Sequence, residues 1–298
     1  MTSVCIGDMK LEVPIIQGGM GVGISLGNLA GHVAKNGGMG VISTAHPGYR
    51  AEDFEKNPTE VNKRELAKEI QKAKEIAKGK GMVAINAMVA ITDYAQMVEV
   101  AIKNKIDAII SGAGLPMNLP GFVKGTKVKI APIVSSGKAA RLICKTWDRR
   151  YHVAPDFVII EGSEAGGHLG FHKEDVLNKT TAKLADIFKE VKETLQPFVE
   201  KYQKEIPIFV AGGVYDADDI KQFMDLGADG VQMATRFICT EECDADIKYK
   251  EAFINAKKED IEIVKSPVGM PGRAIMTKLT ERLKNDERIP VKRCYNCL

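Results

Sequence analysis

The stretch "IPIFVAGGVYDADDIKQFMDLGADGVQMATRF", residues 206–237, decides the fold. Its apolar run "IPIFVAGG" is followed by a helical pattern at about residues 216–226 and then by a second strand, "DGVQMATRF". Short apolar runs bounded by glycine and polar residues are typical of strands buried on both faces, and parallel strands of this kind are joined by helices. The stretch therefore predicts one strand, helix and strand unit.

The same alternation runs through most of the chain. Strands are expected at about residues 13–17, 39–44, 82–89, 107–112, 128–135, 155–162, 206–213 and 229–237, and helices at about 26–36, 59–78, 93–104, 138–148, 181–204 and 216–226. Eight successive units over roughly 230 residues predict an α/β protein with a (β/α)8 TIM barrel. A doubly wound open sheet is the alternative.

The last part of the chain lies outside this repeat. Residues from about 244 to 298 are expected to form helices and loops that pack on the barrel, with "SPVGMPGRAI" at 266–275 as a Pro/Gly-rich loop. That loop is either a surface turn or a cap over the site. Because no linker or shift in composition divides the chain, we expect a single domain over residues 1–298.

Composition excludes several classes of protein. The chain has 298 residues with 45% hydrophobic and 27% charged residues, and 42 basic against 39 acidic residues give a net charge of +3. The lysines are scattered along helices rather than clustered, so nucleic-acid binding is not expected. There is no apolar stretch long enough to span a bilayer, and Asp8, Lys10 and Glu12 interrupt the N-terminus where a signal peptide is apolar. We expect a cytoplasmic protein without membrane contact.

The cysteines do not form a disulfide framework. There are only six in a chain of this length, which is typical of a reducing compartment. Cys294 and Cys297 form a CxxC pair at the end of the sequence. Two ligands are half of what a structural zinc site requires, so this pair is a weak candidate and no metal site is expected.

Candidate site residues follow the strands. "VAGG" ends the seventh strand at Gly212 and Gly213, and "QMATRF" ends the eighth. The loops after these two strands frequently bind phosphate in barrels, because glycine exposes backbone N–H groups there. "QGGMGVG" at 17–23 is not a dinucleotide fingerprint, since Ile24 stands where the last glycine is required. Its glycine turn still allows a flat ligand to lie against the backbone.

Two other strand ends carry polar groups. Asn86, within "AINAMV", is an amide in an otherwise apolar strand, where it either satisfies the strand end or contacts a ring system. "EGSEAGGHLG", residues 161–170, places two carboxylates, two adjacent glycines and one of the five histidines after a buried strand. Such a loop is a candidate site, because ligands bind beyond the carboxyl ends of parallel strands.

With these residues placed, the sequence resembles a family of FMN-dependent barrel enzymes. The family includes nitronate monooxygenase, formerly 2-nitropropane dioxygenase, and the flavin-dependent enoyl-ACP reductase II. The resemblance is carried by "PIIQGGMG", "NGGMGVIST", "EGSEAGGHLG", "IPIFVAGGV", "GVQMATRF" and "GRAI", which together cover nearly the whole chain. It implies an oxidoreductase with FMN as its cofactor and places the FMN-binding positions at Gly19, Met20, Asn86, Glu161, Gly166, Gly167, Gly212, Gly213, Gln232, Met233, Ala234 and Thr235.

Two departures from the family pattern stand out. Ala234 replaces a usual glycine, which leaves a backbone N–H available, and Glu161 occupies a position where relatives often have glutamine. The resemblance also implies that His168 faces the flavin and the substrate as the catalytic residue. An imidazole titrates near neutrality and suits proton transfer beside a redox centre.

Three functions remain open at this point. The resemblance favours oxidation of small alkyl nitronates with O2, because "GGMGVGIS" fits that branch. The alternative is reduction of enoyl thioesters with NAD(P)H as reductant and acyl carrier protein as a partner, which requires a basic rim. Lys124, Lys127, Lys129 and Lys138 are candidates for such a rim. The third possibility is a non-catalytic barrel that binds flavin or phosphate.

Overall fold

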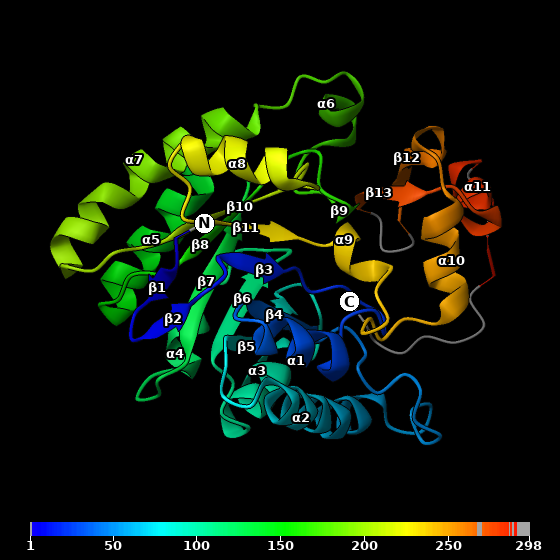
Figure 1. Cartoon of the computed structure of the whole chain (residues 1–298), viewed down its shortest axis with the longest axis horizontal. Helices are drawn as coiled ribbons and strands as arrows, with labels where there is room; N and C mark the ends of the chain where they lie inside the picture. The colour runs from blue at the N-terminus through cyan, green and yellow to red at the C-terminus, as the bar shows by residue number, and fades with distance from the viewer. Residues whose placement is uncertain (1, 267–269, 286, 288, 291–298) are drawn as a thin grey trace.

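Eight parallel strands form a closed barrel in the computed structural model of the chain (Figure 1), which describes residues 2–266, 270–285, 287 and 289–290. The predicted TIM barrel is therefore confirmed. The barrel consists of β3 (Ile15–Gln17), β4 (Met39–Ser43), β5 (Met82–Met88), β6 (Ala108–Gly112), β7 (Lys129–Val134), β8 (Val158–Glu161), β10 (Ile208–Ala211) and β11 (Gly230–Met233).

Helices surround the barrel and create two apolar layers. One layer fills the barrel interior, where the rings of Phe157 and Phe209 meet edge to face with centroids 5.8 Å apart. The other lies between strands and helices and includes the fully buried Trp147. The helices are α1 (Gly27–Lys35), α2 (Pro58–Ala77), α3 (Tyr94–Lys103), α4 (Leu119–Phe122), α5 (Gly137–Tyr151), α7 (Leu184–Tyr202), α8 (Ala217–Asp225) and α9 (Thr235–Ile238).

Three aspartates fix the strands at the N-terminal end of the barrel. Each lies just before a strand, and its carboxylate accepts a hydrogen bond from a backbone N–H at the start of the preceding barrel strand. This bond satisfies a buried donor that the ladder leaves free and sets the stagger of the two strands. The pairs, each at 2.8 Å, are Asp107 with Val83, Asp156 with Ile130, and Asp229 with Ile208.

The first barrel strand depends on a side chain for part of its pairing. β3 has three residues and pairs with β4 only through Ile16 and Met39. The fully buried Gln17 extends this contact, because its Oε1 accepts from the N–H of Val41 at 3.0 Å and its Nε2 donates to the Val41 carbonyl at 3.3 Å. The amide of Gln17 thus takes the place of a backbone peptide in the ladder.

The N-terminus of α1 is held by carboxylates from distant parts of the chain. Asp244 accepts hydrogen bonds from the N–H groups of Leu26 and Leu29, at 2.8 and 3.1 Å. Glu69 of α2 accepts from the N–H of Gly27 at 2.7 Å. Unpaired N–H groups at a helix N-terminus favour negative charge, so these carboxylates cap α1 and attach the C-terminal part of the chain to it.

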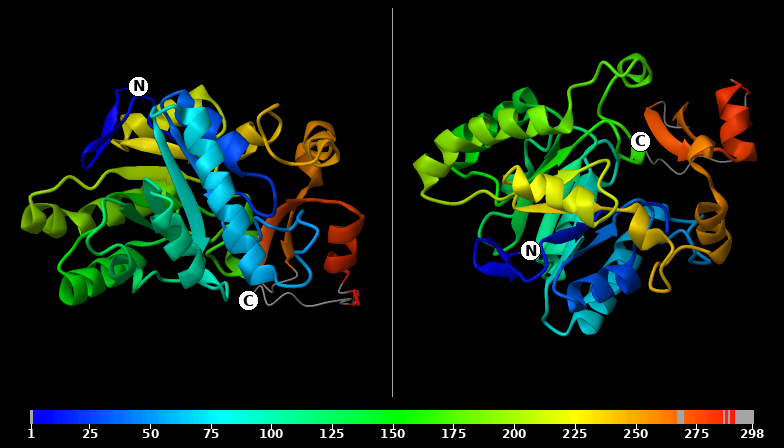
Figure 2. Two further views of the ribbon diagram at one scale, coloured as in Figure 1. Left: turned by 90° about the horizontal axis from the view of Figure 1, so that it is seen from below. Right: turned by 45° about the horizontal axis from the view of Figure 1, so that its top comes forward.

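The part of the chain after about residue 244, called the extension below, contains strands as well as helices. After α10 (Ile247–Asn255), the strands β12 (Ile261–Lys265) and β13 (Pro271–Ile275) form an antiparallel hairpin, followed by α11 (Lys278–Lys284). Figure 2 shows this hairpin standing beside the barrel. The expected Pro/Gly-rich loop over 266–275 is therefore wrong for 271–275. Proline is tolerated as the first residue of a strand, and the alternating pattern of residues 261–265 supplies a partner.

Other short elements were not expected from the sequence. The chain begins with a hairpin of β1 (Val4–Ile6) and β2 (Met9–Leu11), and α6 (Lys173–Leu177) lies within the long connection after β8. No helix in the described part of the chain is long and apolar enough to cross a membrane. The four described cysteines are free thiols, whereas Cys294 and Cys297 lie outside the described residues.

Replacing Gln17 with alanine tests its part in the barrel. We expect the free energy of unfolding to fall by about 2–4 kcal/mol, because the N–H of Val41 loses its partner and a small cavity is left. Urea denaturation measures this change. The control is Gln71→Ala on the exposed face of α2, where we expect less than about 0.5 kcal/mol. Equal effects in the two variants would contradict the role of Gln17.

Candidate functional site

Polar side chains line the inner wall of the barrel where its strands end. Ala211 of β10 belongs to the interior cluster, and its neighbours in register are Glu161 of β8 and Gln232 of β11. Ser43 and Asn86 are paired across β4 and β5, two residues beyond paired members of the same cluster. Because aligned residues of parallel strands point to the same face, all four polar side chains point inward above an apolar floor.

Two of these inward groups have no partner within the described part of the chain. The Oε1 atom of Gln232 is buried and accepts no hydrogen bond. The carboxyl group of Glu161, a half-buried residue, makes no hydrogen bond there, and desolvation raises its pKa to about 7. A buried polar group without a partner costs about 1–3 kcal/mol, so such groups mark positions where a ligand completes the hydrogen bonding.

Glycines lie on one side of the barrel mouth, which is the end where the barrel strands end. Gly212 and Gly213 have φ values of 90° and 86°, a conformation that favours glycine, and a Cβ at Gly213 would lie 2.6 Å from the carboxylate of Glu164. Gly166 and Gly167 face open space, with no atom within 4 Å of the position of an added Cβ. A ligand can therefore approach the backbone of Gly166 and Gly167, whereas the Cβ positions of Gly212 and Gly213 face the loop at 162–165.

The remaining sequence candidates lie at the same end of the barrel. Gly19 adjoins Asn86, whose Cβ would be 2.4 Å from a Cβ on the glycine. Met20 packs with the apolar cluster between α1 and α9, and the side chain of Met233 lies in the layer between strands and helices. These two residues therefore offer their backbone rather than their side chains to the mouth. Ala234 and Thr235 begin α9 directly after β11.

His168 lies on a loop that the extension supports. It belongs to β9 (Gly167–His168), which pairs antiparallel with β13 and continues the hairpin sheet. Its ring is exposed, and Nε2 lies 3.1 Å from the hydroxyl of Ser266. Ser266 did not stand out in the sequence because 98 positions separate it from His168 and only the fold brings the two together.

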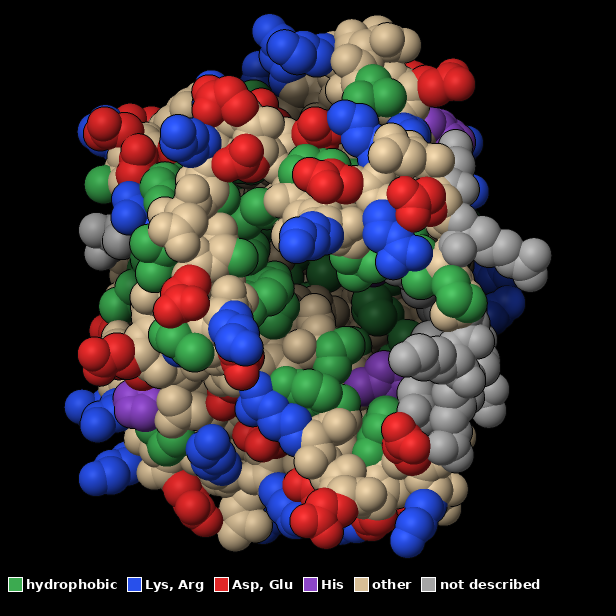
Figure 3. All heavy atoms as spheres, turned by 90° about the vertical axis from the view of Figure 1, so that its right-hand side faces the viewer, with side chains coloured by type: hydrophobic (Ala, Val, Ile, Leu, Met, Phe, Trp, Pro, Cys, Tyr) green, Lys and Arg blue, Asp and Glu red, His purple; other side chains and the backbone are tan. Residues whose placement is uncertain are grey.

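The space-filling view of the face that carries the extension shows a hollow (Figure 3). Apolar side chains lie in its depth, and a histidine lies at its edge. β11 runs toward this face and continues into α9, so the face is the one on which the barrel strands end (Figure 1). A recess with an apolar floor and a few polar groups is typical of a cofactor site.

The four lysines that were candidates for a basic rim do not gather at one end of the barrel. β7 begins at Lys129, so Lys124, Lys127 and Lys129 lie at the N-terminal end of the barrel, opposite the mouth. Lys129 forms an ion pair there with Asp8. Only Lys138, at the start of α5, lies on the side of the mouth. The direction of the strand, which proximity in sequence does not reveal, separates these residues from the site.

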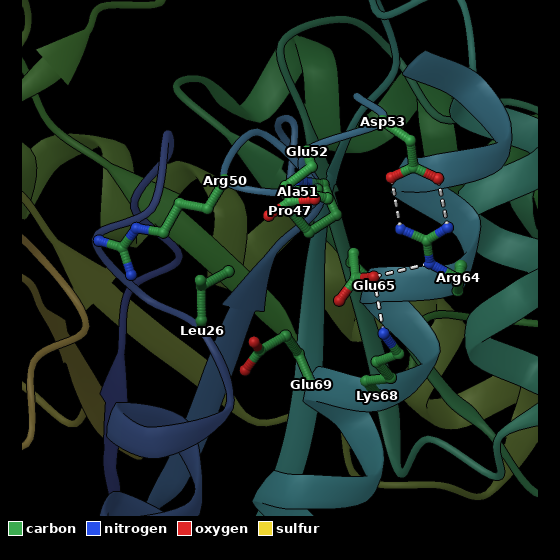
Figure 4. A pocket seen from close by; sticks show the side chains of 11 residues that line it. Leu26, Pro47, Arg50, Ala51, Glu52, Asp53, Arg64, Glu65, Lys68 and Glu69 are labelled. Atoms are coloured by element: carbon green, nitrogen blue, oxygen red, sulfur yellow. Dashed lines mark hydrogen bonds and ion pairs between the residues drawn. The ribbon is translucent and has the colours of Figure 1, made fainter. Parts of the chain in front are cut away.

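A second hollow, of about 490 Å³, lies beside the N-terminal parts of α1 and α2 (Figure 4). Its charged groups are largely paired with one another. Arg64 binds both carboxylate oxygens of Asp53, at 2.7 and 2.9 Å, and Glu65 accepts from Arg64 and Lys68. None of the residues that the sequence predicts to bind the cofactor lines it, so this hollow is separate from the barrel mouth.

Comparison with known proteins identifies the family. The family model described as nitronate monooxygenase matches residues 3–297. The chain belongs to this family. Its members are flavin-dependent oxidoreductases, and the inward amide of Gln232, the carboxyl of Glu161 and the exposed glycine backbone are of the kind that a flavin needs around it.

Individual relatives differ in the activities that their names give. A probable nitronate monooxygenase of Staphylococcus saprophyticus is 35% identical over 136 residues, which cover 45% of this chain and only 36% of that protein's length. An octahydro-indene carboxyl-CoA dehydrogenase of Mycobacterium tuberculosis is 26% identical over 93% of this chain and 67% of its own length. The structure of FabK from Thermotoga maritima has a TM-score of 0.71 and 26% identity, covering 93% of this chain and 75% of FabK.

The raised pKa of Glu161 predicts a pH dependence of stability. Between its ordinary value of 4.5 and about 7, the folded protein binds this proton and the unfolded chain does not. Stability from this group therefore decreases as pH rises through that window, by up to about 3 kcal/mol. We expect Glu161→Gln to gain stability relative to the original protein as pH rises from 5 to about 8, as measured by urea denaturation at several pH values.

The control for this measurement is Glu164→Gln, which removes an exposed carboxylate from the same loop. The difference in unfolding free energy between this variant and the original protein should stay constant over the same pH range. A pH-dependent difference of similar size in both variants would contradict the assignment to Glu161.

Proposed function

We propose that the chain is an FMN-dependent oxidoreductase that binds FMN across the mouth of the barrel and oxidises small alkyl nitronates with O2. The proposal treats residues 1–298 as one functional unit, in which the barrel binds the cofactor and the extension borders the site. FMN, when bound, supplies the transfer of one or two electrons. The chain's own residues bind it, orient the substrate and move a proton.

The main support is a pair of polar groups without partners on the inner wall, the buried amide oxygen of Gln232 and the half-buried carboxyl of Glu161. Gln232 and Glu161 lie on either side of Ala211, at the layer where the strands end, and no described side chain satisfies them. We assign the ring system of FMN to this layer, together with Asn86. The phosphate belongs at the exposed backbone of Gly166 and Gly213, close to the start of α9.

His168 is the proposed catalytic residue. It lies on an exposed loop beside the mouth, and its imidazole has a hydroxyl partner at Nε2, which leaves Nδ1 available to a substrate. An imidazole can accept or donate a proton there. Glu164, exposed on the same loop, is assigned no proton transfer.

Glu161 favours a second candidate function. A nitronate is an anion, and nitroalkanes form it most readily at alkaline pH, where Glu161 also becomes charged because its pKa is about 7. A desolvated carboxylate repels an anionic substrate, which the glutamine that the family resemblance leads one to expect at this position does not. A neutral substrate, such as an enoyl thioester reduced with NAD(P)H, avoids this conflict. Acyl carrier protein or another thioester carrier would then be the partner.

Gly166→Val tests the position of the phosphate. The glycine has open space at its Cβ and no left-handed backbone, so we expect the variant to fold normally. A side chain there should block the approach of the cofactor and raise the dissociation constant for FMN by about tenfold or more. Fluorescence titration of the apoprotein with FMN measures this. An unchanged affinity for FMN in a folded variant would show that the phosphate does not bind at Gly166.

An anaerobic absorption spectrum decides between the two reactions. Bleaching of the flavin band by an alkyl nitronate but not by NADH or NADPH would support nitronate oxidation, and bleaching by a nicotinamide would support the thioester reductase.

In either case, we expect His168→Ala to keep its flavin and to lose turnover by about a hundredfold or more. Bound flavin with no turnover of either substrate class would indicate a non-catalytic barrel.

A further inference from the structure

The C-terminal hairpin contacts the histidine loop at three places. The hairpin is β12 and β13, and the histidine loop is residues 163–169. β13 pairs with β9, so that Gly272 lies opposite His168 and Arg273 opposite Gly167. Next to this pair, the N–H of Leu169 donates to the carbonyl of Pro271 at 3.0 Å. The histidine loop is therefore an edge strand that the hairpin completes.

Arg273 adds a side-chain contact to this pairing. Its Nη2 donates to the carbonyl of Ser163 at 3.0 Å, and its Nε donates to the carbonyl of Ala165 at 3.2 Å. One planar guanidinium thus joins two carbonyls on the same turn of the loop, a geometry that lysine cannot reproduce. These bonds fix the backbone directly before the exposed pair Gly166 and Gly167, which have no side chains to hold them.

The imidazole itself has a partner beside the same hairpin. The hydroxyl of Ser266 lies 3.1 Å from Nε2 of His168, and Ser266 directly follows the last residue of β12. A hydroxyl can donate to or accept from a ring nitrogen, so this contact orients the ring and biases which nitrogen carries the proton. Backbone and ring of the histidine are therefore fixed by one element of the chain.

We propose that Arg273 of the C-terminal hairpin and Ser266 beside it are positioning residues for His168. Arg273 holds the loop backbone and Ser266 holds the ring. This inference rests on the proposed catalytic role of His168. Without the hairpin, a loop with two adjacent glycines and an unpaired edge samples many conformations, and the imidazole spends less time at the mouth of the barrel.

The experiment compares Arg273→Ala, Arg273→Lys and Ser266→Ala with Lys265→Ala in the full-length protein. Lys265 is an exposed cation on the same hairpin, so its removal controls for charge and for the stability of the hairpin. Hydrogen exchange of residues 163–169 reports on the loop, and the imidazole nitrogen NMR signals of His168 report on the ring. These signals are assigned by their absence in His168→Gln. Neither measurement requires flavin or turnover.

We expect Arg273→Ala to speed exchange in the loop by about tenfold or more and Arg273→Lys to recover part of the protection. Ser266→Ala should shift the His168 nitrogen signals while leaving loop exchange near that of the original protein. In the holoenzyme, both alanine variants should lower kcat more than they raise KM. Lys265→Ala should change none of these quantities.

Two results would overturn the proposal. The first is loop exchange and imidazole signals that stay unchanged in the Arg273 and Ser266 variants. The second is a loosened loop with an undiminished kcat, which would make the contacts purely structural. A failure of the proposed function looks different. The original protein would then bind no FMN or turn over no substrate, while exchange and imidazole signals would still respond to the variants.

Discussion

The pairing of the first barrel strand with the last is the contact on which the site depends. β3 joins β11 through three register pairs, and the N–H of Gly18 then donates to the carbonyl of Met233 at 2.8 Å. On its other side, β3 is held to β4 largely by the amide of Gln17. If β3 detached, the barrel would open beside β11, which carries Gln232. A closed sheet has no free edge, which is why three residues are enough.

Within this closed frame, the polar layer at the mouth is a local weakness. The interior cluster below it is apolar and buried, whereas the buried amide oxygen of Gln232 and the half-buried carboxyl of Glu161 have no partners among the described residues. Packing alone would place leucine or valine at both positions. Polar groups there are tolerated because the rest of the barrel offsets a cost of about 1–3 kcal/mol for each. We propose that they contribute to binding rather than to stability.

The barrel could be predicted from the sequence because each strand and helix has its own periodicity and glycine boundaries. The positions of Asn86, Glu161 and Gln232 followed, since parallel strands bring their carboxyl ends together. The C-terminal hairpin could not be predicted, because Pro271 and Gly272 favour a turn unless a partner strand is known. The four lysines could not be placed from the sequence, because proximity in sequence does not reveal at which end of the barrel a residue lies. Ser266 and Arg273 act across about a hundred residues, beyond any local pattern.

The capping of α1 by Asp244 has a consequence for synthesis on the ribosome. The helix forms from residues 27–35, but the carboxylate that binds its first N–H groups is translated more than two hundred positions later. β11, which pairs with the edge of β3, is also synthesised about two hundred positions after β3. Folding of nascent chains generally proceeds from the N-terminus. In this chain, β3 and α1 emerge early but gain these contacts only after β11 and Asp244 have been synthesised, so the edge of β3 stays without its β11 partner until then.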